Sequence, residues 1–321
     1  MSYPFYQAVK AEFIAVNKLI EESLSSHVPL VEEIASYLIN AGGKRLRPLL
    51  VLLSAKACDY QGNDHIKLAV IIEFLHTAML LHDDVVDTSE LRRGRKTANA
   101  QWGNAASVLV GDFLHSRAFE MMVEIGDMKI MSLLSKATNG IAEGEVQQLS
   151  NLKNSAITEA AYREVIYRKT AMLFEVAAHT GAVLAAADSK KQLALCQLGS
   201  DLGIAFQLMD DLLDYEGSTS DLGKNVGDDL AEGKVTLPLI VALRNGSEPQ
   251  RALIKKAIAS GDLTEMAAIL EAVRDAGGIR YTLEQAELAK DRALHNLEQI
   301  KPSSYRQAIN DLVQFSINRQ N

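Results

Sequence analysis

The long stretch without proline is the feature that most constrains the fold of this chain. All six prolines fall before residue 49 or after residue 237. Proline disrupts helix interiors because it lacks a backbone N–H group and its ring clashes with the preceding turn, so its absence here favours long helices. The stretch is rich in good helix formers, and apolar residues recur three and four positions apart, as in Leu173, Val176 and Ala177. No alternating strand pattern interrupts it, and we predict an all-α protein.

Short clusters of glycine, asparagine and aspartate divide the chain into ten to a dozen predicted helices. The breaks fall at residues 42–43, 62–64, 88–97, 126–127, 139–140, 150–155, 188–189, 217–233, 246–249, 261–262 and 277–278. None is long enough or rich enough in proline and serine to be a linker, so we predict a single domain over residues 1–321, although length alone suggests two. The glycine-rich segment 217–233 is either a substrate-binding loop or a plain connection.

Charge and apolar content limit the classes of partner. The chain has 33 basic and 41 acidic residues, a net charge of −8, which argues against nucleic acid or an anionic membrane as a bulk partner. Its first ten residues lack the pattern of a secretory signal, and the longest apolar stretch, residues 68–81, is too short to span a membrane. Cys58 and Cys196 lie in apolar stretches without a metal or redox spacing. We expect a cytoplasmic protein whose anion-binding sites are local.

A polar stripe on a predicted buried helix marks the first candidate site. Residues 68–87 are apolar almost all round, which is typical of a helix buried on most sides. The exceptions are His76, Asp83 and Asp87. Asp83 and Asp87 lie seven and eleven positions after His76, and Glu73 lies one turn before it. At 3.6 residues per turn these side chains share one face. The stripe therefore predicts a cavity against this helix.

A second apolar helix repeats the arrangement. Both helices carry Asp-Asp-x-x-Asp: Asp83, Asp84 and Asp87 in the first, and Asp210, Asp211 and Asp214, after Gln207, in the second. Six buried carboxylates near one another repel unless a cation lies between them. Oxygen ligands without a histidine or cysteine cluster favour Mg²⁺ held jointly by carboxylates and substrate phosphates. One copy alone is also typical of a solvated helix face, but two copies in apolar surroundings disfavour that interpretation.

Basic residues accompany the two stripes, as a phosphate ester held by Mg²⁺ would require. Residues 42–48 read Gly-Gly-Lys-Arg-Leu-Arg-Pro and open a helix, where free N–H groups also favour an anion. The other candidates are Arg92, Arg93, Lys169 with Thr170, Lys224 and Lys234. Each cluster alone is more typical of a solvated charged patch, and it is their placement beside the aspartates that indicates a diphosphate site.

Taken together, these motifs resemble those of the trans-prenyltransferases, the all-E isoprenyl diphosphate synthases. The resemblance extends from about residue 5 to 320 and depends on residues 42–48, 80–87, 92–94, 169–170 and 206–214 in that order. It implies an all-helical terpenoid-synthase fold, a helical bundle around a deep central elongation cavity, usually as a homodimer. It also implies head-to-tail condensation of isopentenyl diphosphate onto an allylic diphosphate.

The same resemblance implies roles for individual residues. The metal ligands for up to three Mg²⁺ would be Asp83, Asp84, Asp87, Asp210, Asp211 and Asp214. The allylic diphosphate would be clamped by Arg92, Lys169 and Lys224, with Lys234 nearby. The isopentenyl diphosphate would be held by Lys44, Arg47, His76 and Arg93, and Thr170 and Gln207 would line the reacting region. Catalysis would rest on the first five aspartates with Arg92, Lys169 and Lys224. Glu145 and Gln148 either support a metal-bound water or are ordinary helix polarity, and the released diphosphate would accept the final proton.

Product length depends on the helix before the first aspartate motif. Ala78 and Met79 lie just over one turn before Asp83, where short-chain members of the family carry aromatic blocks. Small Ala78 leaves the cavity open, which predicts a medium or long product. Similarity to bacterial quinone side-chain synthases favours octaprenyl diphosphate made from farnesyl diphosphate. We consider Phe119, Met121 and Met122 for the cavity floor, although such residues are more often simply core.

Four alternatives remain beside this interpretation. One is a synthase for geranylgeranyl or another chain length. A class I terpene cyclase shares the first aspartate motif, but its usual second motif differs from Asp-Asp-Leu-Leu-Asp. The His82-Asp83 pair is reminiscent of a metal-dependent phosphohydrolase, but further histidine ligands at a suitable spacing are absent. A non-catalytic subunit of a heteromeric synthase would lack motif residues, and both motifs are complete here.

Overall fold

The computed structural model describes residues 3–92, 94–216 and 226–318. Helices form almost all the regular structure in these ranges, which confirms the all-α prediction, and two strands of two residues each form a hairpin. Contacts divide the chain into two compact units, each drawn from three stretches. Unit 1 contains the chain up to residue 138, residues 173–199 and residues 296–312, and unit 2 contains residues 139–172, residues 200–295 and the chain from residue 313. A single domain stays a prediction.

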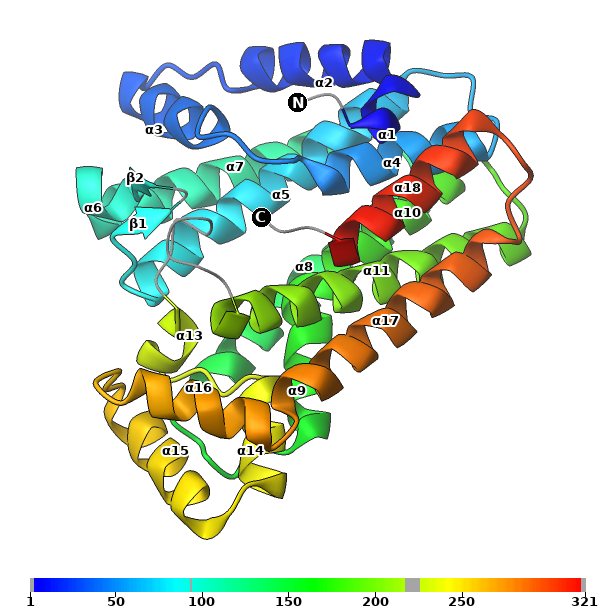
Figure 1. The fold of residues 1–321 in the computed structure, drawn as a ribbon. Helices are drawn as coiled ribbons and strands as arrows, with labels where there is room; N and C mark the ends of the chain where they lie inside the picture. The colour runs from blue at the N-terminus through cyan, green and yellow to red at the C-terminus, as the bar shows by residue number, and fades with distance from the viewer. Residues whose placement is uncertain (1–2, 93, 217–225, 319–321) are drawn as a thin grey trace. The chain divides into compact units, whose positions relative to one another are not determined.

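Unit 1 is built mainly from the N-terminal half of the chain (Figure 1). Its elements are α1 (Pro4–Gln7), α2 (Lys10–Ser23), α3 (Pro29–Ile39), α4 (Leu46–Ala57), α5 (Asp64–Val86), β1 (Leu91–Arg92), β2 (Arg95–Lys96), α6 (Ala98–Trp102) and α7 (Asn104–Ile125). It also includes the first part of α8 (Met128–Ser150), nearly all of α10 (Met172–Leu184) and the first parts of α11 (Ser189–Glu216) and α18 (Ser304–Asn318).

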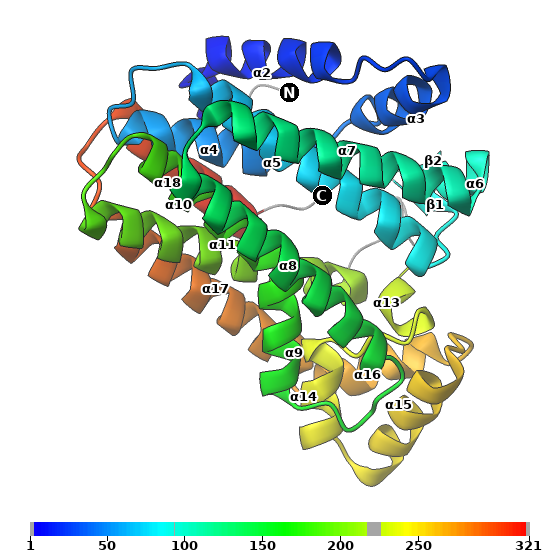
Figure 2. The same cartoon turned by 180° about the vertical axis from the view of Figure 1, so that it is seen from behind.

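The core of unit 1 lies around α5. From Leu68 to Leu75 every side chain of this helix is buried, as its nearly continuous apolar sequence predicts. Helix α7 runs antiparallel along it, which both ribbon views show (Figures 1 and 2). At one end Ser107 Oγ donates to the Leu81 carbonyl at 3.0 Å, and at the other Lys67 Nζ bonds Glu124 Oε2 at 2.8 Å. Hydrophobic burial along α5 therefore fixes the helix that carries the first aspartate motif.

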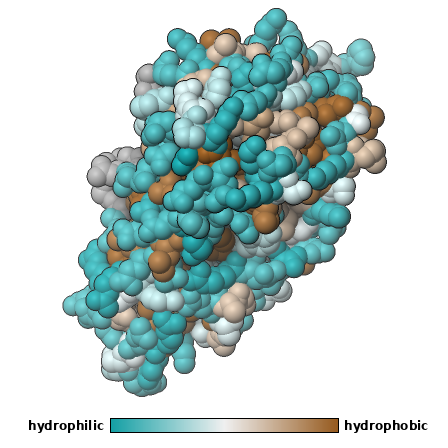
Figure 3. Space-filling model, turned by 90° about the vertical axis from the view of Figure 1, so that its right-hand side faces the viewer, coloured by the Kyte–Doolittle hydropathy of each residue, from teal (hydrophilic) through white to brown (hydrophobic). Residues whose placement is uncertain are grey.

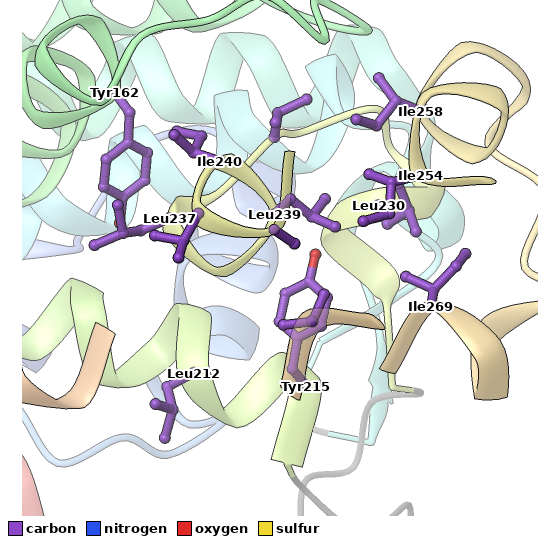
Figure 4. Packing of buried hydrophobic residues seen from close by; sticks show 14 of the residues in the cluster. Tyr162, Leu212, Tyr215, Leu230, Leu237, Leu239, Ile240, Ile254, Ile258 and Ile269 are labelled. Carbon is purple, nitrogen blue, oxygen red and sulfur yellow. The ribbon is translucent and has the colours of Figure 1, made fainter. Parts of the chain in front are cut away.

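Unit 2 is built mainly from the C-terminal half. Its elements are the rest of α8, α9 (Glu159–Ile166), the π-helix η1 (Tyr167–Ala171), the rest of α11, α13 (Asp228–Ala231), α14 (Leu237–Asn245), α15 (Glu248–Ser260), α16 (Met266–Asp275), most of α17 (Gly278–Leu297) and the end of α18. Its core is the apolar cluster in Figure 4, where Leu212 and Tyr215 of α11 pack with Leu237, Leu239 and residues of α13, α15 and α16. This packing holds the helix that carries the second motif.

Most of the predicted breaks separate helices, but one does not, and the breaks between α2 and α3 and between α17 and α18 were not predicted. The described residues contain fourteen α-helices of eight or more residues, more than the sequence breaks predict. The break expected at residues 139–140 is absent because α8 continues through it. A side chain at Gly140 would come within 2.7 Å of the Met172 sulfur, so this glycine serves packing against a neighbour instead of ending the helix. The expected loop 88–97 contains the hairpin of β1 and β2.

The distribution of hydrophilic residues on the surface is the one expected of amphipathic helices, which bury their apolar side. Hydrophilic residues cover most of the face in Figure 3, and hydrophobic residues gather there in separate patches. Across the described residues, we find no helix with both the length and the apolar character that a bilayer crossing demands.

Candidate active site

The first aspartate motif lies at the C-terminal end of α5. Asp83 and Asp87 are half-buried, and Asp87 is the C-cap residue, whose N–H donates to the Asp83 carbonyl at 2.8 Å. Asp84 is fully buried, with an exposed fraction of 0%. The motif therefore presents two carboxylates one turn apart near solvent and places the third inside unit 1.

Asp84 pairs with the arginine predicted to bind a diphosphate. Arg92 Nε and Nη2 bond Asp84 Oδ1 at 2.8 and 2.7 Å. Burial raises the pKa of Asp84 above its ordinary value, and the hydrogen bonds and charge of Arg92 counter this rise. The second carboxylate oxygen, Oδ2, is buried and has no hydrogen-bond partner among the residues that the structure describes. Asp84 thus anchors Arg92, and with it strand β1, to the end of α5.

The hairpin is tied to α5 at further points. Asn99 Nδ2 donates to the carbonyls of Asp84 and Ser89 at 3.1 and 3.2 Å. Thr97 Oγ1 donates to the Ser89 carbonyl at 2.6 Å and accepts from the N–H of Ala100, which caps α6. These bonds fix the position of Arg92 relative to the aspartates. Arg93, the other predicted diphosphate ligand here, lies outside the described residues.

The glycine-rich segment 42–48 brings predicted ligands of the isopentenyl diphosphate together. Arg47, in the first turn of α4, lies with Nη1 3.2 Å from His76 Nε2 of α5. Its guanidinium carbon also lies 4.2 Å from the ring centre of Phe174, a contact that the sequence did not reveal. Lys44 lies two residues before the helix and is half-buried. Arg47 and His76 therefore meet as predicted.

The second aspartate motif lies near the end of α11, and like the first it has two accessible carboxylates and one buried carboxylate. Asp210 is exposed and Asp214 is half-buried, while Asp211 has an exposed fraction of 1%. Asp211 Oδ2 accepts a hydrogen bond from the hydroxyl of Tyr162, and Oδ1 accepts one from Gln207 Nε2 at 2.8 Å. Burial, followed by the charge of Asp229, raises the pKa of Asp211 well above its ordinary value.

These bonds form a chain that crosses from α9 to η1. Gln207 Oε1 accepts from Thr170 Oγ1 at 2.8 Å, so Tyr162, Asp211, Gln207 and Thr170 are linked in series. Thr170 and Gln207 meet as the sequence predicts for residues that line one region. Tyr162 was not predicted, although it lies seven positions before Lys169 and therefore two helical turns away on the same face.

Lys169 lies in the π-helix η1, a widened turn that is frequent at functional sites. Its Nζ bonds Glu145 Oε2 of α8 at 2.7 Å, so Glu145 is a partner of a predicted substrate ligand. Gln148 lies one turn further along α8 and is half-buried. Helix α11 approaches the π-helix so closely that a Cβ at Gly203 would lie 2.4 Å from the Ala171 Cα. Gly203 therefore permits the packing that supports Lys169 and Thr170.

The end of the segment 217–233 and the residue after it supply one predicted cation, Lys234, and one acidic residue that was not predicted, Asp229. Lys234 is half-buried, and its Nζ bonds Glu232 Oε2 at 2.6 Å. Its backbone N–H donates to the carbonyl of Asp229, whose side chain contributes to the raised pKa of Asp211. The adjacent acidic pair after Gly227 is the sequence signal that could have revealed Asp229. Lys224 lies outside the described residues.

The residues considered for product length lie in unit 1. Ala78 is buried with an exposed fraction of 2%, and Met79 is half-buried. Met121 and Met122 are buried on α7, and Phe119 is half-buried with its ring 5.0 Å from that of His115. These positions are compatible with a cavity wall along α5 and α7. The elongation cavity stays a prediction.

The donor set suits Mg²⁺ shared with a substrate more than a closed protein site. No group of three or more histidine, cysteine, aspartate or glutamate side chains is placed to hold a metal within the described ranges. Mg²⁺ usually takes only one or two carboxylates and completes its shell with water and substrate phosphates. Asp83 with Asp87 and Asp210 with Asp214 each form such an accessible pair on one helix face. The two pairs belong to different units, and their convergence on one substrate stays a prediction.

Comparison with known proteins identifies the relatives of this chain. A family model described as polyprenyl synthetase matches residues 28–275. The octaprenyl diphosphate synthase of Escherichia coli is 46% identical over 309 residues, which cover 96% of each chain. The crystal structure of a decaprenyl diphosphate synthase from Rhodobacter capsulatus has a TM-score of 0.94 and 43% identity, covering 99% of this chain and 98% of that one. The crystal structure of a polyprenyl synthase from Caulobacter crescentus, complexed with calcium and isoprenyl diphosphate, has a TM-score of 0.95 and 42% identity. The match covers 99% of this chain and 98% of that one.

Proposed function

Because the chain belongs to the polyprenyl synthetase family and is a trans-prenyltransferase, we propose that it condenses isopentenyl diphosphate head-to-tail with farnesyl diphosphate and extends it to all-trans octaprenyl diphosphate. The carrying observation is the near full-length similarity to octaprenyl diphosphate synthase. The small, buried Ala78 supports a long product, since it places no bulky side chain along α5 just before the aspartates. We propose that this polyprenyl chain becomes the side chain of a quinone.

The metal proposal follows from the exposure of the six aspartates. Asp83, Asp87, Asp210 and Asp214 are the members that solvent reaches, and they would hold up to three Mg²⁺ together with the allylic diphosphate. Asp84 and Asp211, which the sequence also predicts as ligands, are buried and bonded to Arg92 and to Tyr162 and Gln207. In this arrangement they position their neighbours and reach an ion only if those bonds exchange.

The basic residues divide between the two substrates. Lys44, Arg47, His76 and Arg93 would hold isopentenyl diphosphate, and Arg92, Lys169, Lys224 and Lys234 would hold the allylic diphosphate. The Arg47–His76 contact supports the first set because two polar side chains from different helices meet at the start of α4. Thr170 and Gln207, joined at 2.8 Å, would border the allylic carbon that reacts.

The mechanism needs electrostatics and a dry cavity. When bound, Mg²⁺ supplies Lewis-acid stabilisation of the leaving diphosphate. Lys169 and Arg92 neutralise the negative charge that grows on this group as the allylic C–O bond breaks. The double bond of isopentenyl diphosphate attacks the resulting allylic cation, and one proton leaves to the released diphosphate. The apolar side chains of α5 exclude water that would otherwise trap the cation as an alcohol.

One incubation tests this function. The purified chain is given isopentenyl diphosphate, farnesyl diphosphate and Mg²⁺, and the product is identified by mass. We expect the forty-carbon diphosphate, no turnover in chelator, and a strong loss of turnover in Asp83→Ala and Asp210→Ala. Exposed Asp262 of unit 2 provides the control Asp262→Ala, which should keep activity. Absence of any product longer than farnesyl diphosphate, or full turnover in chelator, would contradict the proposal.

Another chain length is the second candidate. The decaprenyl diphosphate synthase from Rhodobacter capsulatus is nearly as similar to this chain as the octaprenyl enzyme is, so identity alone separates the lengths poorly. The same mass measurement decides, because each added isoprene unit has five carbons. A geranylgeranyl product would indicate that the cavity ends near α5, and a cyclised hydrocarbon would indicate a terpene cyclase.

We also propose a homodimer, and individual exposed apolar side chains of unit 1 support it. On α7 Leu109 and Val123 have exposed fractions of 66% and 64%, and Met128 at the start of α8 has 73%. Large apolar side chains with this much exposure are candidates for burial in an interface. Light scattering should show a dimer for the native chain and a monomer for Leu109→Glu. Leu193→Glu, at another exposed leucine of unit 1, should remain dimeric. A monomeric native chain would refute this proposal.

We further propose that the enzyme acts in the cytoplasm, and the free thiols of Cys58 and Cys196 support this location. Cell fractionation tests this location. Recovery of the chain with the membrane after a high-salt wash would contradict it.

A further inference from the structure

The segment that precedes α4 has an unusual backbone at Arg45. This residue has φ 42° and ψ 45°, in the left-handed region that side chains other than glycine and asparagine seldom adopt. It separates Lys44 from Arg47, the two basic residues proposed to hold isopentenyl diphosphate. A conformation of this kind persists only where surrounding contacts stabilise it. The contacts of Arg45 therefore decide where its two functional neighbours lie.

The guanidinium of Arg45 points into unit 1 and joins three helices. It donates to Asn17 Oδ1 on α2, to the Ile39 carbonyl at the end of α3 at 3.1 Å, and approaches Glu73 Oε1 on α5 at 3.5 Å. The side chains of Arg45 and Glu73 have exposed fractions of only 16% and 11%. A half-buried arginine with three acceptors from separate helices is a fixed point of the fold and is poorly placed to bind a substrate.

The backbone on the other side of Arg45 is held by the N-terminal helix. The hydroxyl of Tyr6 in α1 donates to the carbonyl of Lys44. The Tyr6 ring packs against Phe5 and Phe13, with ring centres 5.0 and 5.1 Å apart. Burial raises the pKa of Tyr6 to about 12, so the hydroxyl keeps its proton and remains a donor at neutral pH.

Two parallel contacts connect this segment with α5. Glu73 and His76 are three positions apart and so lie one turn apart on the same face of the helix. Glu73 receives Arg45, and His76 meets Arg47 at 3.2 Å. The Arg45–Glu73 contact lies inside unit 1, whereas the Arg47–His76 contact joins two residues proposed to bind the substrate. Arg45 thus sets the register in which Arg47 meets His76.

We propose that Arg45, supported by Glu73 and Tyr6, is a positioning residue for isopentenyl diphosphate. It holds the left-handed turn that aims Lys44 and Arg47, and it does not touch the substrate. This inference rests on the proposed function, in which Lys44, Arg47 and His76 bind that diphosphate. Loss of Arg45 displaces the binding groups for one substrate and leaves the allylic site in place.

The test compares Arg45→Lys with a matched arginine elsewhere. Lysine keeps the charge but lacks the planar fork that serves three acceptors. We expect the KM for isopentenyl diphosphate to rise about tenfold, while the KM for farnesyl diphosphate changes by less than about twofold. Arg163→Lys is the control: its guanidinium bonds Glu159 at 2.7 Å in unit 2, and its replacement should lower the melting temperature without changing either KM.

A second variant, Tyr6→Phe, removes one hydroxyl and keeps the ring. We expect it to raise the KM for isopentenyl diphosphate about threefold, and it decides the matter if Arg45→Lys does not fold. Unchanged KM values, or an equal rise for both substrates, would overturn the inference. Native enzyme that consumes no isopentenyl diphosphate would instead refute the proposed function, so the two failures are distinguishable.

Discussion

The bond between Tyr162 and Asp211 is the most informative contact to remove. Tyr162→Phe deletes a single oxygen from a side chain that is 4% exposed, and it leaves Asp211 Oδ2, on a residue that is 1% exposed, without this donor. A buried carboxylate oxygen that loses its hydrogen bond costs about 2 kcal/mol. With an unfolding entropy of about 2.1 cal/mol/K per residue, a chain of 321 residues changes by roughly 0.7 kcal/mol for each degree. The melting temperature should therefore fall by roughly 3 °C.

The same change should slow the reaction. Asp211 holds Gln207, which holds Thr170, so a displaced carboxylate disturbs both residues proposed to border the reacting carbon. We expect kcat to fall about tenfold, equivalent to about 1.4 kcal/mol of transition-state stabilisation.

The assays are urea or thermal unfolding and steady-state kinetics. Tyr60→Phe is the matched control, because its hydroxyl bonds Asp64 Oδ2 at 3.3 Å on the surface, where the loss should stay within about 0.5 kcal/mol. If Tyr162→Phe is as stable and as active as this control, the series of hydrogen bonds from Tyr162 to Thr170 does not support the site.

Three further predictions use single substitutions. Ala78→Phe should shorten the product, which mass measurement shows, and an unchanged product would reject the role of this position in chain length. Gly203→Ala forces a methyl group against the Ala171 backbone and should cost about 1–3 kcal/mol and most of the activity, whereas Gly140→Ala meets only the flexible Met172 side chain and should cost less. Burial and then the charge of Lys56 lower the pKa of His65, so its stabilising effect is present above pH 6.5 and lost as the pH falls toward the lower folded value. Melting temperatures between pH 7.5 and 5.5 should fall more for the native chain than for His65→Leu, and parallel curves would contradict this.

Local sequence predicts the fold class because helices depend on short-range rules. The missing prolines and the three-and-four spacing of apolar residues suffice to indicate an all-α chain. Boundaries that depend on distant partners are not predictable in this way. Gly140 resembles a break but lies inside α8, since the side chain of Met172, from far along the chain, fills the space beside it. The hairpin of β1 and β2 likewise depends on Asn99 and Asp84.

The site shows the same division between local and distant information. Residue types and helical spacing predict the meetings of Arg47 with His76 and of Thr170 with Gln207. Periodicity does not reveal that Asp84 is buried while its neighbour Asp83 is accessible, because Asp84 is the one that pairs with Arg92 of strand β1. Tyr162 could not be predicted from the motif for the same reason, since only the packed structure shows that its hydroxyl donates to Asp211.

The interleaved composition of the two units has a consequence for biosynthesis. Unit 1 needs residues 296–312 and unit 2 needs the residues that follow them, so neither set of contacts can be completed before the ribosome has made these residues. Until then the parts of unit 1 that bury Ile300, Ile309 and Leu312 stay uncovered and favour aggregation. Nascent chains should therefore depend on chaperones late in translation, and a truncated gene should yield insoluble protein instead of one working half.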